Sequence, residues 1–357
     1  MVNRFLVLLA LLALTACARP QSAGFVEPVP EASRETIFIA TMRTEGQRGQ
    51  MFGEKRSTVM SYAELNISIP PNHQIGRIER SRGQIDARRH FAPLSATPLA
   101  NSAKLNERLK ASRISAEEPL LIFVHGYNNT LEDAAFRLAQ IQHDFELNNP
   151  ALLFSWPSAG DPLGYAYDRD SVLFARTDFA RLLEALNRAG QRRVIILAHS
   201  MGSYLVMESL RQLALEGKTH NIDALEAVVL MSPDIDPDVF RQQAGEIGRL
   251  PQPFIIMTTQ KDRVLNVSSL LTGRKERLGR IQNAEEVEGL DVSVMDFSLF
   301  ETGENMGHMV PVSSPAAIRF LRISRKLGSD FARSRARVSR HRGQPFHDCG
   351  QAGRQGS

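Results

Sequence analysis

The stretch RRVIILAHSMGSYLV, residues 192–206, decides the fold class. It opens with the uninterrupted apolar run VIIL, which is typical of a strand buried on both faces, and it ends in a segment that predicts a helix. Ser200 lies between them, with the small residues Ala198 and Gly202 two positions away on either side. Small side chains there allow the strand and the helix to approach closely at a sharp turn that pushes a serine hydroxyl outward. The stretch therefore indicates a candidate nucleophile at Ser200, and the alternative interpretation is a serine that only caps the following helix.

The flanking sequence alternates between further apolar strands and amphipathic helices. Apolar residues recur at helical spacing after residue 131 and after residue 172, and the second of these helices is expected to end near Gly190. The other strand candidates are TIFIATMRT, YAELNISIP, PLLIFVHG, ALLFSWPS, ALEAVVLMS, PQPFIIMTTQ and DVSVMDFSLF, and the chain between the second and the third of them is irregular and polar. Doubly buried strands separated by amphipathic helices predict an α/β fold with a doubly wound, mainly parallel sheet and helices on both faces. In such sheets, ligands bind at the carboxyl ends of the strands.

Composition limits the protein classes that the chain can belong to. Its 357 residues are 43% hydrophobic and 23% charged, which predicts a globular protein with one large core or two small ones. Much of the net charge of +4 comes from the basic stretch RKLGSDFARSRARVSRHRGQ near the C-terminus, so the body of the chain is close to neutral. Cys17 and Cys349 are the two cysteines, and one pair excludes both a disulfide scaffold and a zinc site built from cysteines.

The N-terminal segment MVNRFLVLLALLALTAC, residues 1–17, has the basic start and the short apolar run of an export signal. The residues from Leu14 to Cys17 resemble the lipobox of bacterial lipoproteins. This resemblance implies export and a membrane tether through a lipidated Cys17. By analogy with lipoprotein sorting, Ala18 after the cysteine favours the outer membrane over the inner one, with the body facing the periplasm. The alternatives are an ordinary signal peptide that is cleaved nearby and an uncleaved anchor.

The rest of the chain divides into three parts. Residues 18–35 contain three prolines and no apolar periodicity, so we expect a flexible tether. We expect residues 36–327 to form the folded domain. Residues 328–357 are rich in Arg, Ser and Gly and are expected to form a basic, disordered tail. A tail that touches anionic lipid or nucleic acid is the alternative to a solvated one, and no nucleic-acid partner is expected.

A serine hydroxyl needs a base to take its proton and a third group to orient that base. Asp262 follows the strand candidate PQPFIIMTTQ, and His308 lies in a loop after the last strand candidate. The order Ser, Asp, His along the chain is the one expected for α/β folds with this turn. The alternatives are an exposed loop histidine at His308 and a turn or N-cap residue at Asp262.

Asp234 and Asp236 are rival candidates for the acid, because they follow the preceding strand candidate. Pro233 and Pro237 flank them and indicate a rigid turn. We therefore favour Asp262 as the acid and expect the two rival aspartates to shape the pocket.

The attack by serine creates an oxyanion, which needs backbone N–H donors that are already in place. One donor is expected at Met201, at the positive end of the helix after the serine. The second is expected at Tyr127, after Gly126 in the turn HGYNN at the end of an earlier strand. His125 and His199 are alternative bases, but each lies at the end of a buried strand and is expected to have a structural role, His125 by hydrogen bonding and His199 by packing beside the serine.

With its HGYNNT turn, FSWPS strand end, AHSMG elbow, and the QKD and MGH segments, the chain resembles the α/β-hydrolase superfamily over roughly residues 36–325, and in particular a bacterial group of esterase/lipase-like hydrolases. The resemblance implies Ser200 as the nucleophile, Asp262 as the acid and His308 as the base. It also implies Tyr127 and Met201 as the oxyanion donors. Ala198 stands where the commonest form of the elbow has glycine.

These observations predict a membrane-tethered serine hydrolase that cleaves a small-molecule ester or a lipid and uses no metal and no organic cofactor. One alternative is a thioesterase or an acyltransferase of the same fold. Another is a non-catalytic envelope lipoprotein that uses the fold as a binding module. Two segments, residues 158–167 and 267–288, are candidates for shaping the entrance of the site.

Overall fold

The computed structural model describes residues 24–46, 51–81, 83–115, 118–271, 273, 276–281, 284–301 and 307–324. The predicted export signal with Cys17, the first part of the predicted tether and the predicted tail lie outside the described residues. Within the described ranges, no helix is both long enough and apolar enough to cross a membrane.

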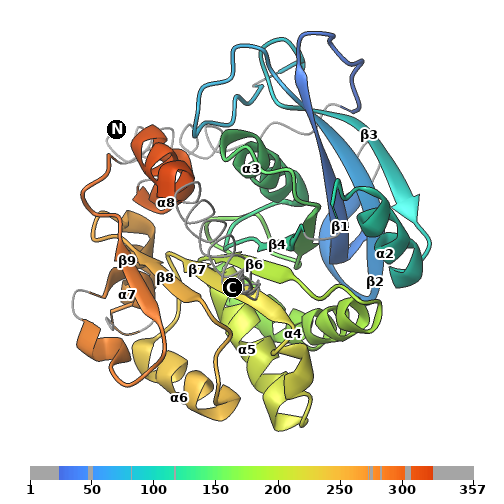
Figure 1. Cartoon of the computed structure of the whole chain (residues 1–357). Coiled ribbons are helices and arrows are strands. Elements are labelled where there is room, and N and C mark those ends of the chain that lie inside the picture. Colours follow the sequence, from blue (N-terminus) through green and yellow to red (C-terminus); the bar gives the residue numbers. More distant parts are fainter. Residues whose placement is uncertain are drawn as a thin grey trace, which may run out of the picture.

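One sheet of nine strands runs through the described part of the chain, in the order β3-β2-β1-β5-β4-β6-β7-β8-β9 (Figure 1). From β1 to β9 in this order all neighbours are parallel, and β2 and β3 form an antiparallel extension beyond β1. The strands are β1 (Ser33–Glu45), β2 (Phe52–Ile69), β3 (Ala92–Leu99), β4 (Leu120–Val124), β5 (Ala151–Ser155), β6 (Val194–His199), β7 (Leu225–Met231), β8 (Phe254–Thr258) and β9 (Ser293–Asp296).

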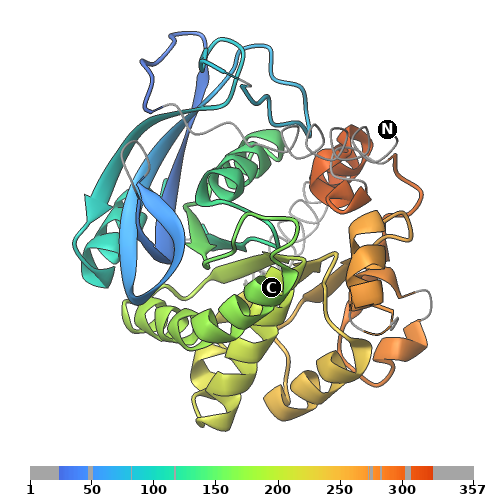
Figure 2. The ribbon, with the colours of Figure 1, turned by 180° about the vertical axis from the view of Figure 1, so that it is seen from behind.

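Helices cover both faces of this sheet, as Figures 1 and 2 show from opposite sides. Helices α2, α4, α5 and α6 contribute to one apolar cluster, and α3 contributes to a second cluster with the segment around α8. The helices are α2 (Ser102–Ala111), α3 (Leu131–Asp144), α4 (Tyr165–Arg188), α5 (Met201–Leu215), α6 (Pro237–Ile247), α7 (Arg263–Leu271) and α8 (Val310–Ser313). Short 3-10 turns occupy Thr219–Asn221, Leu278–Arg280 and Ala284–Val287, and residues 315–324 are helical.

Local sequence explains why these elements form. Every residue of β4 and β5 is buried, as expected for strands that have helices on both sides. Helix α3 begins with a capping box, in which the side chains of Thr130 and Asp133 each accept a backbone N–H of the other residue. Helix α6 begins with the N-cap Asp236 followed by Pro237, whose fixed φ suits the first helical position.

The structure confirms the predicted α/β class with a mainly parallel sheet and helices on both faces. The region predicted as irregular before β4 instead contains β3 and α2. Both are elements at the edge of the sheet, and α2 buries only three of its ten residues, so the apolar pattern that marks a core element is weak there. Strand β1 begins at Ser33, inside the segment predicted as a tether, and Val29 before it packs with Ala87 and Ala92.

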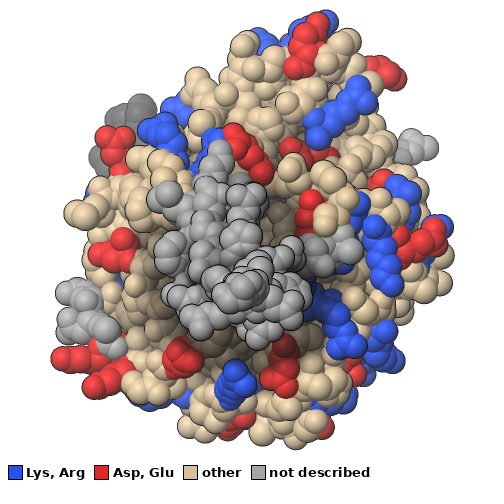
Figure 3. All heavy atoms as spheres, viewed as in Figure 1, with Lys and Arg blue, Asp and Glu red and all other residues tan. Residues whose placement is uncertain are grey.

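Figure 3 shows one face of the molecule in the orientation of Figure 1. Lys and Arg side chains are interspersed with Asp and Glu side chains over the described surface that is visible there.

Candidate active site

Ser200 lies on a strained turn between β6 and α5. Its φ of 53° and ψ of −123° are a backbone conformation that residues other than glycine rarely adopt. The chain holds this conformation with backbone hydrogen bonds: Ser200 N–H donates to Met231 O at 3.0 Å, and Asp234 N–H donates to Ser200 O at 3.2 Å. A strained serine between a buried strand and a helix N-terminus is the arrangement that presents a hydroxyl at the edge of the sheet.

Two glycines allow the chain to pack tightly around this turn. A Cβ atom on Gly202 would lie 2.3 Å from His125 O and 2.6 Å from Val124 O, so the start of α5 rests directly on the end of β4. A Cβ atom on Gly126 would lie 2.6 Å from His199 Nδ1 and 2.8 Å from Ser200 Cβ. Glycine at positions 126 and 202 is therefore a steric requirement of the turn.

His308 and Asp262 lie side by side, although 46 residues separate them. The His308 Nδ1 atom is 2.6 Å from Asp262 Oδ2, and both side chains are buried. The Asp262 Oδ1 atom accepts the Leu265 N–H at 2.9 Å, so this aspartate also caps the first turn of α7. The other ring nitrogen, His308 Nε2, is buried and has no hydrogen-bond partner among the described residues.

His199, which precedes Ser200, connects the serine turn to His308. The two imidazole rings are 4.5 Å apart between centroids, and His199 Nε2 lies 3.3 Å from the His308 carbonyl oxygen. Burial, and then the proximity of His308, holds the pKa of His199 well below its usual range, so its ring is neutral at pH 7. His199 is the last residue of β6, Ser200 follows it directly, and His308 follows β9; parallel strands end at the same edge of the sheet, which is where the sequence predicted the site.

The two rival aspartates make other contacts. The Asp234 carboxylate accepts the Ser268 hydroxyl at 2.6 Å and the Tyr165 hydroxyl at 3.1 Å, and it lies 3.1 Å from Arg277 Nε. Asp236 caps α6 by accepting the Asp238 N–H. Of the three candidate acids, Asp262 is the one whose carboxylate is in hydrogen-bond contact with His308.

Asp168 of α4 stabilises the HGYNN turn after β4 through hydrogen bonds. This carboxylate is fully buried and accepts the Asn128 N–H at 3.0 Å, the Ala159 N–H at 2.7 Å and the Ser158 hydroxyl at 2.6 Å. Ser158 Oγ in turn accepts the Asn129 N–H at 3.1 Å. Asn128 has a φ of 58°, so these bonds fix a turn that bends through the left-handed region.

Arg43 of β1 supports the same turn from within the core. Its guanidinium donates to Asn129 O at 2.9 Å, to Ser158 O at 3.0 Å and to Ser155 Oγ at 2.9 Å. Burial lowers the pKa of Arg43 to about 10, which leaves it charged at neutral pH. A buried cation with several acceptors gives the turn a fixed geometry.

The Tyr127 side chain extends from this turn towards the segment before α4. Its hydroxyl donates to Pro162 O, and its ring lies edge to face with Tyr165 at 5.5 Å. Burial, followed by the nearby anions Asp168 and Asp161, raises the pKa of Tyr127 to about 12. These contacts make Pro162 and Tyr165 part of the wall beside the HGYNN turn.

His125 is buried and hydrogen-bonded, as expected. Its ring stacks on Trp156 at 4.9 Å and lies 2.9 Å from Gly126 O, and Trp156 Nε1 donates to His125 O at 2.7 Å. Burial, and then the charge of Arg43, lowers the pKa of His125 to about 3. The Ser155 hydroxyl lies 3.3 Å from His125 Nε2, but it also accepts a hydrogen bond from Arg43, and both groups are buried in the core.

A cavity of about 850 Å³ opens beside these residues. Its wall includes Gly126, Tyr127, His199 and His308. Ser200 is 1% exposed and is not itself among the residues that line the cavity, whereas its neighbours Gly126 and His199 are. The size falls within the range of small-molecule sites.

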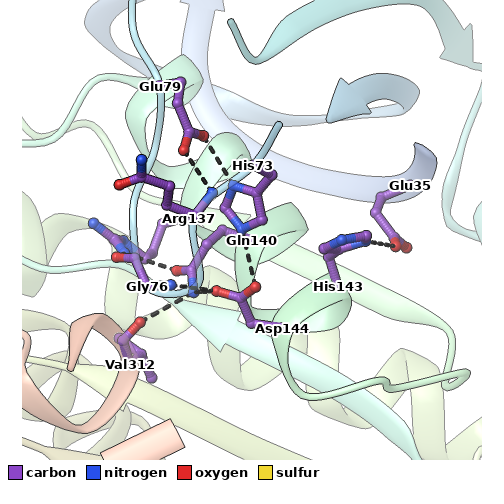
Figure 4. A network of polar contacts seen from close by, with 10 residues as sticks. Glu35, His73, Gly76, Glu79, Arg137, Gln140, His143, Asp144 and Val312 are labelled. Atoms are coloured by element: carbon purple, nitrogen blue, oxygen red, sulfur yellow. Dashed lines mark hydrogen bonds and ion pairs between the residues drawn. The ribbon is translucent and has the colours of Figure 1, made fainter. Parts of the chain in front are cut away.

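A second polar network ties α3 to the helix that follows His308 (Figure 4). His73 Nδ1 lies 2.9 Å from Glu79 Oε2, and His73 Nε2 lies 2.9 Å from Asp144 Oδ1. Gln140 of α3 donates to Asp144 Oδ2 at 2.5 Å and to Val312 O of α8 at 3.0 Å. Burial alone would lower the pKa of His73, but its hydrogen bonds to the two carboxylates outweigh burial and raise the pKa to about 9.

The sequence singled out the serine turn, Asp262, His308 and the HGYNN turn as candidates, and it gave no indication of the groups that support the HGYNN turn. Asp168 carried no signal, because an aspartate in the first turn of a helix is common. Arg43 could have been found, because a cation inside the apolar strand TIFIATMRT needs buried acceptors. Within the described residues, no cluster of His, Cys, Asp and Glu has the arrangement of a metal site.

Several solved structures resemble the chain. A "predicted CIB-like hydrolase" from Thermoplasma acidophilum is 19% identical, with 59% of this chain and 89% of that chain covered and a TM-score of 0.35. An esterase from Pyrobaculum calidifontis is 11% identical, with 85% and 87% covered and a TM-score of 0.38. A dienelactone hydrolase from Anabaena variabilis is 11% identical, with 75% and 90% covered and a TM-score of 0.38. No curated protein matches the chain.

A family model gives the assignment that these structures alone do not. The model described as "Alpha/beta hydrolase of unknown function (DUF900)" matches residues 97–325, which extend from the end of β3 past α8 and include the serine turn, Asp262 and His308. The chain therefore belongs to this family of α/β hydrolases.

Proposed function

We propose that the protein is a serine hydrolase that cleaves carboxylic esters through an acyl-enzyme on Ser200. The observation that carries this proposal is the environment of His308: one ring nitrogen lies 2.6 Å from the Asp262 carboxylate, and the other is buried without a hydrogen-bond partner among the described residues. A base for a serine nucleophile needs a carboxylate that orients the ring and a second nitrogen that can take a proton. The packing of His308 against His199, next to Ser200, supports the same role.

The reaction has two balanced steps. Ser200 Oγ attacks the carbonyl carbon of the ester while its proton passes to His308 Nε2, and the alcohol then leaves with that proton. Water attacks the acyl-enzyme by the same route, which releases the carboxylic acid and restores the Ser200 hydroxyl. The Asp262 carboxylate stabilises the imidazolium that forms in each step.

The backbone N–H groups of Tyr127 and Met201 are the proposed donors to the oxyanion. Met201 is the first residue of α5, where N–H groups have no carbonyl partner within the helix and the helix dipole is positive. Tyr127 belongs to the turn that Asp168 and Arg43 hold rigid. Donors that are fixed before the reaction are worth more than mobile ones, because no reorganisation is needed as charge develops.

Hydrolysis of p-nitrophenyl acetate by the full chain tests the proposal. We expect turnover that is lost in Ser200→Ala and retained in the matched control Ser203→Ala, whose buried hydroxyl bonds to Ala198 O. A folded protein that hydrolyses no ester in a panel of acyl chains and alcohols would instead support the binding module. Turnover that survives in Ser200→Ala would assign the activity to another group.

We further propose that the protein is anchored in the bacterial envelope, facing the periplasm, through a lipid on Cys17. The support is the sequence from Leu14 to Cys17. The wild-type protein expressed with its N-terminus is expected to partition into detergent, and Cys17→Ser is expected to stay in the aqueous phase. Aqueous partition of the wild type would exclude the anchor.

A further inference from the structure

The cavity beside His308 extends away from the site along the antiparallel edge of the sheet. We call this part of the cavity the apolar arm. Its walls are formed by Phe52 and Leu65 of β2, Ala96 of β3, Phe91, Phe123 of β4 and Phe136 of α3. Leu65 and Ala96 are cross-strand partners, and the rings of Phe91 and Phe136 are 5.9 Å apart, so these side chains form one continuous surface.

The apolar arm is elongated. Its length follows from the pairing of β2 with β1. Phe52 and Leu65 of β2 both line the arm, and their pairing partners on β1 are Glu45 and Ile37, which are eight residues apart along β1. At about 3.3 Å per residue, this wall extends for roughly 26 Å along the strand. A wall of that length suits an extended chain better than a compact group.

Arg80 and Arg137, two cations that line the cavity near the arm, are bound by other groups of the protein, and Glu54 and Glu132 also line the cavity. Arg80 forms an ion pair with Asp133 at 2.8 Å, and its guanidinium lies over the Phe136 ring at 5.8 Å. Arg137 donates to Gln140 Oε1 at 2.7 Å. Because these cations have protein partners, the surface that remains for a ligand in the arm is mainly hydrocarbon.

We propose that the apolar arm binds the acyl chain of the ester, and that the preferred substrates carry a long, unbranched hydrocarbon acyl group. This inference rests on the proposed function, because the arm belongs to the same cavity as His308 and the HGYNN turn, where the ester would react. Each methylene group that enters the arm leaves water. A gain of about fourfold in kcat/KM per methylene is the upper expectation from the transfer of hydrocarbon out of water.

A series of p-nitrophenyl esters from acetate to dodecanoate tests the inference. For the wild type, kcat/KM is expected to rise with acyl length up to at least octanoate. Ala96→Phe narrows the arm and is expected to lower kcat/KM for octanoate and dodecanoate at least tenfold more than it lowers kcat/KM for acetate. Ala96→Leu is expected to give a smaller loss. The matched control is Thr97→Phe, an exposed position on the other face of β3, which should leave the whole series unchanged.

The outcomes separate the inference from the function on which it rests. Acetate turnover that depends on Ser200, with no rise towards longer chains in the wild type, overturns the inference and leaves the hydrolase proposal intact. The inference also fails if Ala96→Phe lowers kcat/KM equally for all chain lengths. No Ser200-dependent turnover of any ester overturns the hydrolase proposal itself. Acetate turnover reports the folding of each variant, and if Ala96→Phe does not fold, Ala96→Leu and the wild-type series decide.

Discussion

His73 provides a pH-dependent contribution to stability that can be calculated and measured. In the folded chain the pKa of His73 is about 9, above the usual histidine value of 6.5, because its hydrogen bonds to Asp144 and Glu79 favour the charged ring despite burial. A group whose pKa is raised by folding stabilises the folded state most at pH values below its unfolded pKa. That stabilisation is lost as the pH rises through the folded pKa.

The two pKa values set the magnitude. The difference corresponds to about 3 kcal/mol well below pH 6.5, falling to about 2.5 kcal/mol at pH 7 and to less than ~0.5 kcal/mol at pH 9. Removal of the ring in His73→Gln should therefore destabilise the protein strongly at pH 6 to 7 and progressively less as the pH approaches 9. The network in Figure 4 connects His73 to α8, because Gln140 donates hydrogen bonds to both Asp144, the partner of His73, and Val312 of α8.

Urea unfolding of the wild type and His73→Gln, at intervals from pH 6 to pH 9.5, measures this difference. The subtraction cancels the other titrating groups that the two proteins share. Asp144→Asn serves as the second variant, because loss of one carboxylate should lower the pKa of His73 and move the loss of stability to lower pH. A difference between wild type and His73→Gln that is constant over this range would refute the reasoning, as would a midpoint near 6.5 in an NMR titration of His73.

Three further predictions concern the site. Asp262→Asn is expected to lower kcat by roughly 10³–10⁴-fold with little change in KM, whereas Asp234→Asn is expected to lower kcat much less. Kinetics that rank the two variants in the opposite order would reassign the acid. Asp168→Asn is expected to lower kcat about tenfold or more, because an amide cannot accept all three hydrogen bonds that fix the HGYNN turn, and an unchanged kcat would deny it that role. Gly202→Ala is expected to lower the free energy of unfolding by about 1–3 kcal/mol in urea titrations, while the control Gly245→Ala, which meets nothing within 4 Å, should be neutral or stabilising.

Much of the fold and the core of the site could be predicted, because they depend on local patterns. Apolar runs identified β4 to β8, and the small residues around Ser200 identified the turn whose φ of 53° the structure contains. The position of His308 relative to Asp262 followed from chain order and from the rule that parallel strands end at one edge of the sheet. That His308 and Asp262 lie close together across 46 residues could be anticipated in this way, but the distance between the His308 ring and the Asp262 carboxylate could not.

The missed features depend on contacts that no local pattern records. Arg43 donates to Asn129, 86 residues away, and Asp168 accepts from Asn128, 40 residues away. The apolar arm is formed partly by β3, which the sequence did not predict because its outer face is exposed. A contact with His308 and a helix cap do not exclude each other at Asp262, because one carboxylate makes both contacts through its two oxygens.

The most direct test of the central claim is the identification of the residue that a fluorophosphonate modifies. After the full-length protein is labelled, peptide mass spectrometry should find one phosphonyl adduct on the peptide that contains Ser200, and labelling should be absent in Ser200→Ala and much slower in His308→Ala. An adduct on Ser155, whose hydroxyl contacts His125, or labelling that persists in Ser200→Ala, would contradict the account.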